Sequence, residues 1–272
     1  MAVQSLSSPQ GASLRLGDLA RKGRGLVLPL LLLGLWETAV ALRLVAPNLL
    51  PPPSELVGTV KELAADGALF QHILISTLRV FSGFLIGAVL AIVVGAFVGL
   101  SARAEAFVGP TFQAVRAIPS LAWAPLLLLW FGIDETPKII LIAIGAFFPV
   151  YLNLVSGVHG VDRKLVELGD VYGLKGPQLI WRIFLPAALP NLFTGLRSGL
   201  SLAWMFLVAA ELIAATRGVG YLLTDGQETG RADIVIVSII TLALLGKLSD
   251  SLLSLLERSL LRWRDVYRSS EA

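Results

Sequence analysis

The chain has 272 residues, of which 56% are hydrophobic and 15% are charged, and its formal net charge is +3. A soluble domain of this length typically carries about 25% charged residues, and the apolar residues here gather into runs long enough to cross a bilayer. The absence of cysteine excludes disulfides, thiol nucleophiles and thiolate metal sites. The two histidines lie far apart in sequence, which argues against a histidine-built metal site. The composition therefore predicts an integral membrane protein.

Six apolar runs predict an all-α polytopic membrane protein with six transmembrane helices. Ala39-Val40-Ala41 resembles a signal-peptide cleavage site, but the long basic leader and the full membrane length of the first run disfavour that interpretation. Pro119 and Pro125 interrupt the third run, so neighbouring protein or water must satisfy the freed backbone groups there. The expected spans are residues 25–45, 81–100, 115–131, 138–158, 194–216 and 234–256.

The distribution of basic residues predicts the orientation of the chain. Most of the 22 Lys and Arg residues fall before the first span or in segments that an even number of spans places on the same side as both termini. Because positively charged loops stay in the cytoplasm, both termini are predicted to be cytoplasmic. The transmembrane domain is expected over residues 25–258, between cytoplasmic tails at residues 1–24 and 259–272.

Small residues recur every four positions in the second span and, over a shorter stretch, in the fifth. On a helix such residues form a smooth ridge that lets another helix approach closely. We expect the ridge of the second span to serve packing only. The two ridges are Gly83, Gly87, Ala91, Gly95 and Gly99, and Gly195, Gly199 and Ala203.

A polar segment, ELGDVYGLKGPQLIWRIFLP, separates the fourth and fifth spans. Asp162 is a suitable cap for a short helix, and Gly173 is expected to end that helix with a positive φ. Gly176-Pro177 is expected to start another turn, and Pro186 and Pro190 to break the chain before the fifth span. The residues alone predict two short helices at the cytoplasmic face. Such helices serve either as an amphipathic anchor in the headgroup layer or as a docking element for another protein.

The same segment resembles the cytoplasmic loop of ATP-binding-cassette (ABC) importer permeases. In that family the pattern is EAA, three residues, Gly, nine residues, Ile, one residue and Leu-Pro. The matching positions are Glu167, Gly173, Ile183, Leu185 and Pro186. Leu168 and Gly169 stand where the family has two alanines. The resemblance implies a type I importer permease whose coupling helix, within residues 159–190, rests in a groove of a separate ATP-hydrolysing subunit.

The resemblance also implies which residues couple the permease to that subunit. The glycines among them would allow close backbone approach, and the two acids would pair with basic groups of the partner. The implied coupling residues are Glu167, Gly169, Asp170, Gly173 and Leu174.

Three further fragments resemble the aliphatic sulfonate permeases, and the likeness extends from the first span to Trp263. They are AIPSLAWAPLLLLWFGIDETPKI, TRGVGYLLTDGQETGRADIV and LLGKLSDSLLSLLERSLLRW. The implied protein is a homodimeric permease of a bacterial cytoplasmic membrane, with two ATP-binding subunits and a periplasmic or tethered solute-binding protein. Its implied substrate is a small organic anion, with taurine, nitrate or a pyrimidine precursor as alternatives to an aliphatic sulfonate. ATP and Mg would bind the partner subunits, and this chain would hold no cofactor, metal, catalytic residue or nucleic acid.

Ionisable and polar groups within spans are costly and are therefore candidates for the translocation pathway. The candidates are Arg116, Trp123, Asn153, Trp204 and Glu211. Arg116 would attract an anion or, as we favour, snorkel from a cytoplasmic helix end. Glu211 would form an ion pair near Arg217, gate a cavity or contact substrate. The two tryptophans would line a pathway or anchor the protein at the membrane interface, and the asparagine would supply hydrogen bonds inside the bundle.

Two other classes of protein fit the sequence less well. An ion-coupled secondary transporter would need a buried titrating site in a self-sufficient chain, and the polar segment would then have no purpose. A membrane-embedded enzyme is weaker still, because no catalytic constellation is present in the sequence.

Overall fold

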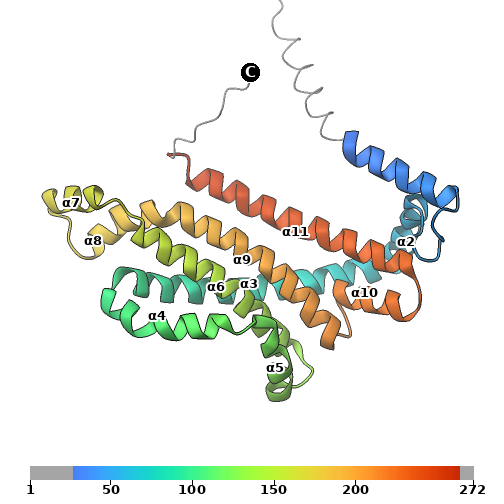
Figure 1. Cartoon of the computed structure of the whole chain (residues 1–272), viewed down its shortest axis with the longest axis horizontal. Coiled ribbons are helices and arrows are strands. Elements are labelled where there is room, and N and C mark those ends of the chain that lie inside the picture. The colour runs from blue at the N-terminus through green and yellow to red at the C-terminus, as the bar shows by residue number, and fades with distance from the viewer. Residues whose placement is uncertain (1–26, 264–272) are drawn as a thin grey trace, which may run out of the picture.

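The computed structural model describes residues 27–263, which form helices and no strands (Figure 1). Four helical runs are long and apolar enough to cross a membrane, and a bent pair of helices makes a fifth span if it is counted as one. The four are α3 (Ala68–Leu100), α6 (Glu135–His159), the run Pro177–Ala214 and α11 (Ala232–Leu260), and the bent pair is α4 (Ala102–Ala117) with Ser120–Phe131. The first predicted span corresponds to a shorter apolar helix, Val27–Ala41. The predicted tail at residues 1–24 lies outside the described residues.

Shorter helices occupy both ends of the molecule (Figure 1). One end carries α7 and α8, and the opposite end carries α2 and α10. The remaining elements are α2 (Pro53–Ala65), η1 (Ser120–Trp123), α5 (Ala124–Phe131), α7 (Arg163–Val171), α8 (Pro177–Leu179), the π-helical turn η2 (Ile180–Phe184), α9 (Leu185–Ala214) and α10 (Val219–Glu228).

Helix α6 lies at the centre of the bundle, packed between α3 and α9. The two ridges of small residues make both contacts. A Cβ added at Gly83 of α3 would lie 2.7 Å from the Cβ of Ile142, and one added at Gly195 of α9 would lie 3.0 Å from the carbonyl oxygen of Pro149. Any larger side chain would push the helices apart, so the expectation that the ridge of the second span serves packing is confirmed within the chain.

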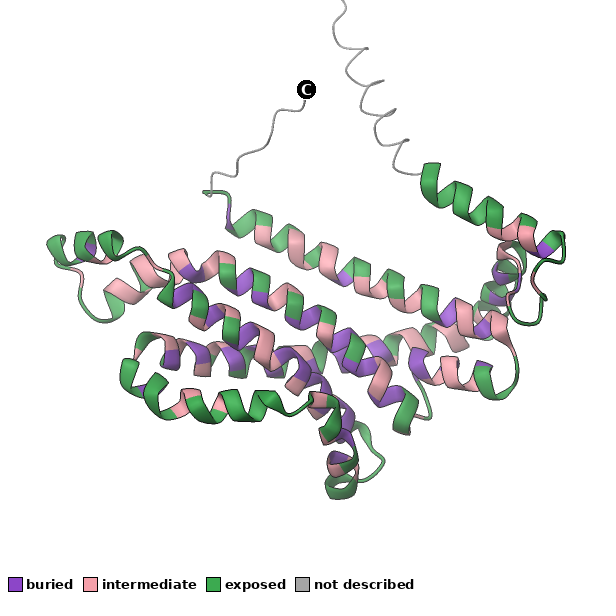
Figure 2. Cartoon of the chain, in the orientation of Figure 1, coloured by how far each residue is buried: buried purple, intermediate pink, exposed green. Residues whose placement is uncertain are grey.

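The buried side chains concentrate where α3, α6 and α9 meet (Figure 2). Large apolar side chains cover much of the outer surface as well, including Leu85 on α3 and Leu244 on α11. Lipid tails are as apolar as these side chains, so packing against small residues takes the place of hydrophobic burial in joining the helices. The outward apolar surface agrees with the predicted membrane location.

The third predicted span is not one straight helix. Its α4 part begins at Ala102, and the chain then bends by 83° before η1 and α5. Pro119 has no N–H and disfavours the helical region for the residue before it. Ile118 accordingly has ψ 122°. Proline therefore breaks the span near its middle, at one of the two positions singled out in the sequence.

The second and fifth spans are longer than predicted. Helix α3 starts at Ala68, because Arg79 is neutralised by two carboxylates and does not end the helix. The expected break at Pro186 and Pro190 is wrong, since Pro177–Ala214 is one helical run. Pro186 falls in the first turn of α9, where its missing N–H is tolerated, and the wider turn η2 immediately precedes it.

Arg231, just before α11, fastens the short helix α2 to the bundle. Its guanidinium contacts both carboxylate oxygens of Glu62 at 3.0 and 3.1 Å, and it also binds Asp233. The hydrogen bond and the positive charge of Arg231 lower the pKa of Glu62. This contact fixes the end of the molecule opposite α7.

Candidate functional site

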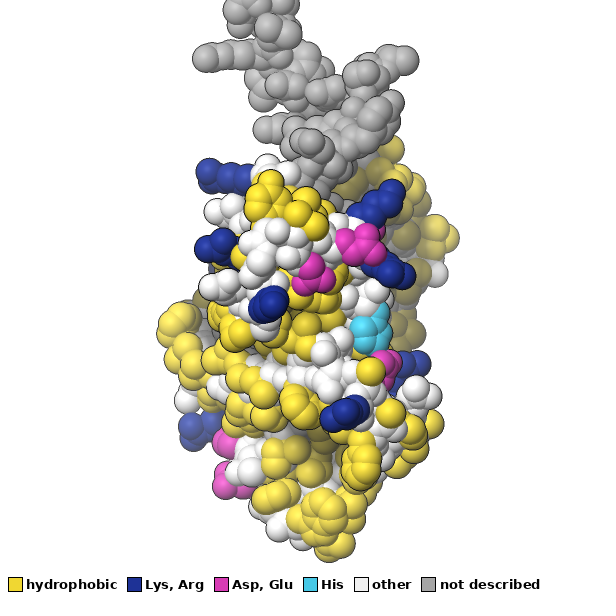
Figure 3. All heavy atoms as spheres, turned by 90° about the vertical axis from the view of Figure 1, so that its left-hand side faces the viewer, with side chains coloured by type: hydrophobic (Ala, Val, Ile, Leu, Met, Phe, Trp, Pro, Cys, Tyr) yellow, Lys and Arg dark blue, Asp and Glu magenta, His cyan; other side chains and the backbone are white. Residues whose placement is uncertain are grey.

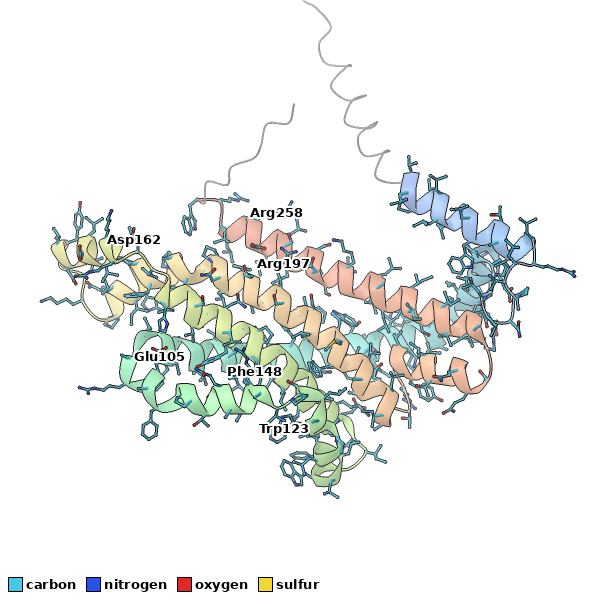
Figure 4. All side chains as sticks on the ribbon, in the orientation of Figure 1. Glu105, Trp123, Phe148, Asp162, Arg197 and Arg258 are labelled. Carbon is cyan, nitrogen blue, oxygen red and sulfur yellow. The ribbon has the colours of Figure 1, made fainter. Side chains whose placement is uncertain are left out.

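A cleft separates α4 from α6 and contains two neighbouring cavities. The larger cavity, of about 600 Å³, has an apolar lining that includes Ile86, Leu90, Phe112, Trp123, Trp130 and Phe148. The smaller, of about 280 Å³, is lined by polar and aromatic residues that include Glu105, Phe112, Gln113, Arg116, Phe148 and Tyr151. Phe112 and Phe148 border both cavities. In Figure 4, Glu105, Phe148 and Trp123 follow one another along the cleft.

Arg116 lies at the end of α4 that is remote from α7. Helix α4 starts near the α7 end of the molecule, where Glu105 approaches His159 at 3.6 Å. At 1.5 Å per residue, Arg116 is roughly 20 Å further along α4. Its neighbour Val115 lines the larger cavity together with Ile86, from the middle of α3. Arg116 lies in the last turn of α4, and its snorkelling from a cytoplasmic helix end, the interpretation that the sequence favours, stays a prediction.

The guanidinium of Arg116 has no carboxylate partner among residues 27–263, in contrast to those of two other arginines in the spanning helices. Arg79 contacts two carboxylates, and Arg197 lies 2.9 Å from Asp250 in a polar cavity between α9 and α11. Within residues 27–263, Arg116 forms no ion pair and is exposed. It also adjoins the backbone break at Pro119. Irregular backbone at membrane depth occurs where it is buried in protein or lines a water-filled cavity.

A buried charged network lies in the N-terminal half of α3, away from the cleft residue Arg116. Arg79 Nε donates to Glu135 at 2.6 Å, and Arg79 Nη1 donates to Glu211 at 2.8 Å. Arg79 and Glu211 are 4% and 1% exposed. Ser76 Oγ donates to Glu211 at 2.7 Å, and the backbone N–H of Gly220 donates to the same carboxylate at 2.7 Å. The network joins α3, α6, α9 and α10, so it is a structural connection between helices.

The segment between α6 and α9 has the caps expected from its sequence. Asp162 accepts a hydrogen bond from the N–H of Lys164 at 2.9 Å. Gly173 has φ 71°, and the N–H of Leu174 donates to the carbonyl of Gly169 at 2.9 Å. This 6→1 bond, beside a left-handed glycine, is the Schellman ending of a helix. The positive φ predicted for Gly173 is therefore confirmed.

Helix α7 exposes apolar side chains at the end of the molecule. Val171 and Tyr172 are 83% and 77% exposed, and Leu168 is also exposed. Figure 3 looks onto this end and shows apolar side chains with basic side chains around them. The surface suits either of the two roles that the sequence left open.

Residues 83–262 match the family model described as the binding-protein-dependent transport system inner membrane component. The chain belongs to this family. It is 46% identical over 244 residues to the aliphatic sulfonates transport permease protein SsuC of Bacillus subtilis (strain 168), which covers 90% of this chain and 88% of that protein. It is 36% identical to the taurine transport system permease protein TauC of Escherichia coli (strain K12), over 85% of this chain and 86% of that one.

The fold of the permease matches a solved transporter. The MetNI methionine ABC transporter, described in inward-facing conformations, aligns with a TM-score of 0.61 at 20% identity, over 71% of this chain and 96% of that one. The prediction of an ABC importer permease fold is thereby confirmed. Together with the family match and the SsuC relative, this makes the chain a permease subunit of an ABC importer. Its location is the inner membrane. The predicted count of six spans is not established by residues 27–263, which hold four or five long spans and one shorter apolar helix.

The predicted pathway residues of the permease divide into two groups. Arg116 and Trp123 line the neighbouring cavities of the cleft. The other three make contacts within the bundle. Trp204 Nε1 donates to Ser249 at 2.9 Å, and Asn153 Nδ2 donates to the carbonyl of Pro149 at 2.8 Å. Glu211 forms the ion pair that was one of its three open interpretations, but its partner is Arg79 rather than Arg217.

The predicted coupling residues of the permease also differ in their surroundings. A Cβ at Gly169 would lie 2.6 Å from Leu179 and Ile183 of the same chain, so the close approach there is internal. Glu167 accepts from Arg163 at 2.8 Å, while Asp170 is exposed. Gly173 has no neighbour within 4 Å of an added Cβ and lies beside open space.

Sequence reasoning missed Arg79 and Phe112. Arg79 stands at the edge of the predicted second span and is not among the candidates that the sequence gives for the pathway. The available signal was Glu211, because a carboxylate inside a span requires a buried cation as its partner. Phe112 lies in a stretch that no predicted span covered. Among the described residues, no group of three or more His, Asp and Glu side chains is arranged to hold a metal.

Proposed function

We propose that the permease carries a small organic anion, an aliphatic sulfonate, across the bacterial cytoplasmic membrane. The names of the SsuC relatives of Bacillus subtilis and Escherichia coli support this substrate class, and both are more similar to this chain than the taurine permease is. The observation that carries the proposal is the available charge of Arg116 in a cleft at a break in a membrane helix. Intramembrane ionisable residues usually mark substrate or ion pathways.

The proposed assembly contains two copies of this chain, two separate ATP-binding subunits that hold ATP and Mg, and a solute-binding protein. Residues 159–190 would dock on the ATPase, with both tails, residues 1–24 and 259–272, in the cytoplasm and a six-helix domain over residues 25–258. The match of residues 83–262 to the binding-protein-dependent permease family and the open, left-handed Gly173 support docking over a purely lipid-facing role.

The contacts of α7 suggest how ATP would drive transport. Gly169 of α7 packs on Leu179 and Ile183, which belong to the same helical run as α9. Closure of the ATPase pair on ATP binding would pull the two α7 helices together, and each α9 would follow. The pathway would then open to the outside, and hydrolysis of ATP would return the assembly to its starting conformation.

Replacement of Arg116 tests the substrate assignment. In proteoliposomes containing the complete complex and its binding protein, Arg116→Gln should lower sulfonate uptake about tenfold or more, because a charge-assisted bond to the anion is lost. Arg116→Lys should retain part of the uptake. Arg103→Gln, in the first turn of α4, is the control. Wild-type uptake by Arg116→Gln would contradict the proposal, as would uptake that continues under vanadate and is driven by an ion gradient.

A further inference from the structure

The cleft between α4 and α6 combines two chemistries in adjoining spaces. We call the smaller cavity, with Arg116 and Gln113, the head chamber, and the larger apolar cavity the tail chamber. Phe112 and Phe148 line both, so the two chambers adjoin at these rings. Neighbouring residues on a helix point about 100° apart, and Val115 faces the tail chamber while Arg116 faces the head chamber. The charged and apolar sites thus begin within one turn of α4.

We propose that one amphiphilic sulfonate occupies both chambers, with its anionic group at Arg116 and its alkyl chain in the tail chamber, so that the permease itself selects substrates by chain length. This inference rests on the proposed function. It assigns the selectivity to residues that the anion-binding argument does not use, chiefly Ile86 and Leu90 of α3 and Trp123 beyond the break.

The dimensions and polarity of the tail chamber fit an alkyl chain. Its volume of about 600 Å³ falls within the roughly 300–1,000 Å³ of small-molecule sites. Its lining residues are apolar and aromatic and carry no charged side chain. A polar or charged group at the far end of a substrate would lose its hydration there without a partner.

The head chamber leaves its positive charge beside the tail chamber. Glu105, the acid that also lines the head chamber, lies three turns before Arg116 on α4 and is close to His159. An anion at Arg116 would therefore sit at the end of the head chamber that adjoins Phe112 and Phe148. A lipid tail alone would leave the adjoining arginine without an anion, whereas an alkyl sulfonate supplies both groups. An anionic lipid would supply both as well, and the test below distinguishes it from the sulfonate.

Chain length gives the inference a quantitative consequence. Each methylene transferred from water to apolar surface shifts a partition ratio by about fourfold. A variant that fills the tail chamber should therefore lower the uptake of a long sulfonate much more than that of a short one. Loss of the Arg116 charge should instead lower the uptake of both sulfonates by a similar factor.

The test is uptake of octanesulfonate and ethanesulfonate by Leu90→Trp in proteoliposomes with the complete complex and one binding protein throughout. Leu90 is exposed on the wall of the tail chamber, so the larger ring projects into the space. The octane-to-ethane uptake ratio should fall about tenfold or more relative to wild type. Leu85→Trp, at an exposed position on α3 outside both chambers, is the matched control and should keep the wild-type ratio.

The outcomes separate the inference from the proposed function. If the wild-type complex takes up neither sulfonate, the proposed function is wrong. If the wild-type complex takes up both and Leu90→Trp leaves their ratio unchanged, or lowers both equally, chain-length selection in this cleft is refuted and lipid or a second copy covers the tail chamber. Should Leu90→Trp fail to assemble, Ile86→Phe on the same wall is measured by the same ratio. Arg116→Gln should leave the ratio near wild type while lowering both rates.

Discussion

Arg79 and Arg116 are both arginines in the membrane part of the chain, but their surroundings are opposite. Arg79 is 4% exposed and bound by two carboxylates, whereas Arg116 is exposed in a cleft without an ion pair among residues 27–263. A charge in apolar surroundings is tolerated when it is paired or when water reaches it. Arg79 therefore belongs to the framework, and Arg116 remains available to a ligand.

Removal of Arg79 should destabilise the permease strongly. Arg79→Met leaves the buried Glu211 without its cation, which should cost about 3–5 kcal/mol and appear as a lower melting temperature of the purified complex in detergent. The double variant Arg79→Met, Glu211→Met removes both buried charges and should recover part of the loss. Arg197→Met is the control, because its partners Asp250 and Glu257 are partly exposed. A single variant that melts like wild type would show that the network contributes little.

The partners of individual buried side chains were only partly predictable from sequence. The notion that Glu211 forms an ion pair followed from its place in a span, but its partner is 132 residues away and the nearest arginine in sequence supplies only a backbone carbonyl. Trp204 likewise pairs with Ser249, on another helix. Local sequence identifies a group that needs a partner, and only the packing of helices determines which partner it receives.

Single elements show why proline is an uncertain predictor of helix ends. Pro119 breaks the third span as its chemistry predicts, yet Pro186 lies in the first turn of α9 and Pro190 within it. Pro119 and Pro186 differ in the backbone that precedes them. A π-helical turn at Ile180–Phe184 lies just before Pro186, and neither apolar periodicity nor composition reveals such a turn. The cap at Asp162 and the glycine ending of α7 were predictable, because both depend on local hydrogen bonds.

The ending of α7 gives a prediction about coupling. Gly173→Asp places a side chain at φ 71°, which costs roughly 1–2 kcal/mol, and adds an acid to the surface that is proposed to dock on the ATPase. Because no neighbour within the chain lies near an added Cβ, insertion in the membrane should be nearly normal. The variant should lose the ATPase on co-purification, or retain it without sulfonate uptake.

Gly58→Asp is the matched control for that variant. Gly58 lies in α2, has open space around it and has no positive φ. It should show wild-type assembly and uptake. If Gly173→Asp behaves like Gly58→Asp in both measurements, α7 rests on lipid instead of docking on an ATPase.

The two ends of the molecule are predicted to face opposite sides of the membrane, and this orientation can be tested directly. The chain has no cysteine, so single cysteines report unambiguously. Asp134, just before α6, and Gln227, in α10, are exposed, and so is Lys175, between α7 and α8. Helix α10 lies at the opposite end of the molecule from α7 and α8 (Figure 1). In intact cells an impermeant thiol reagent should label Asp134→Cys and Gln227→Cys. Lys175→Cys should react only after permeabilisation, since positive segments stay cytoplasmic.

The reverse labelling pattern would overturn the orientation and, with it, the docking of α7 on a cytoplasmic ATPase. Labelling of all three positions in intact cells would instead point to leaky cells. An Arg103→Cys variant, at the α7 end of α4, checks for this because it should remain unlabelled.

At this scale the sequence predicted the membrane class, the central helices and the small-residue contacts, since each depends on apolar length or on local spacing. It did not predict the cleft. The cleft arises because the break at Pro119 turns α5 away from the line of α4 and because α6 lies between α3 and α9. Both are properties of the assembled bundle.

The unbroken helical run Pro177–Ala214 has a mechanical consequence. One end carries the contact with α7, and the other is anchored through Glu211 to Arg79. If the run turns about that fulcrum as a rigid body, its displacement declines in proportion to distance from the fulcrum. Gly195, which touches α6, lies about midway along the run. If an ATPase draws α7 inward, α6 would therefore shift by roughly half as much, and the wall of the cleft would move with it. Glu211 and Arg79 would stay nearly stationary.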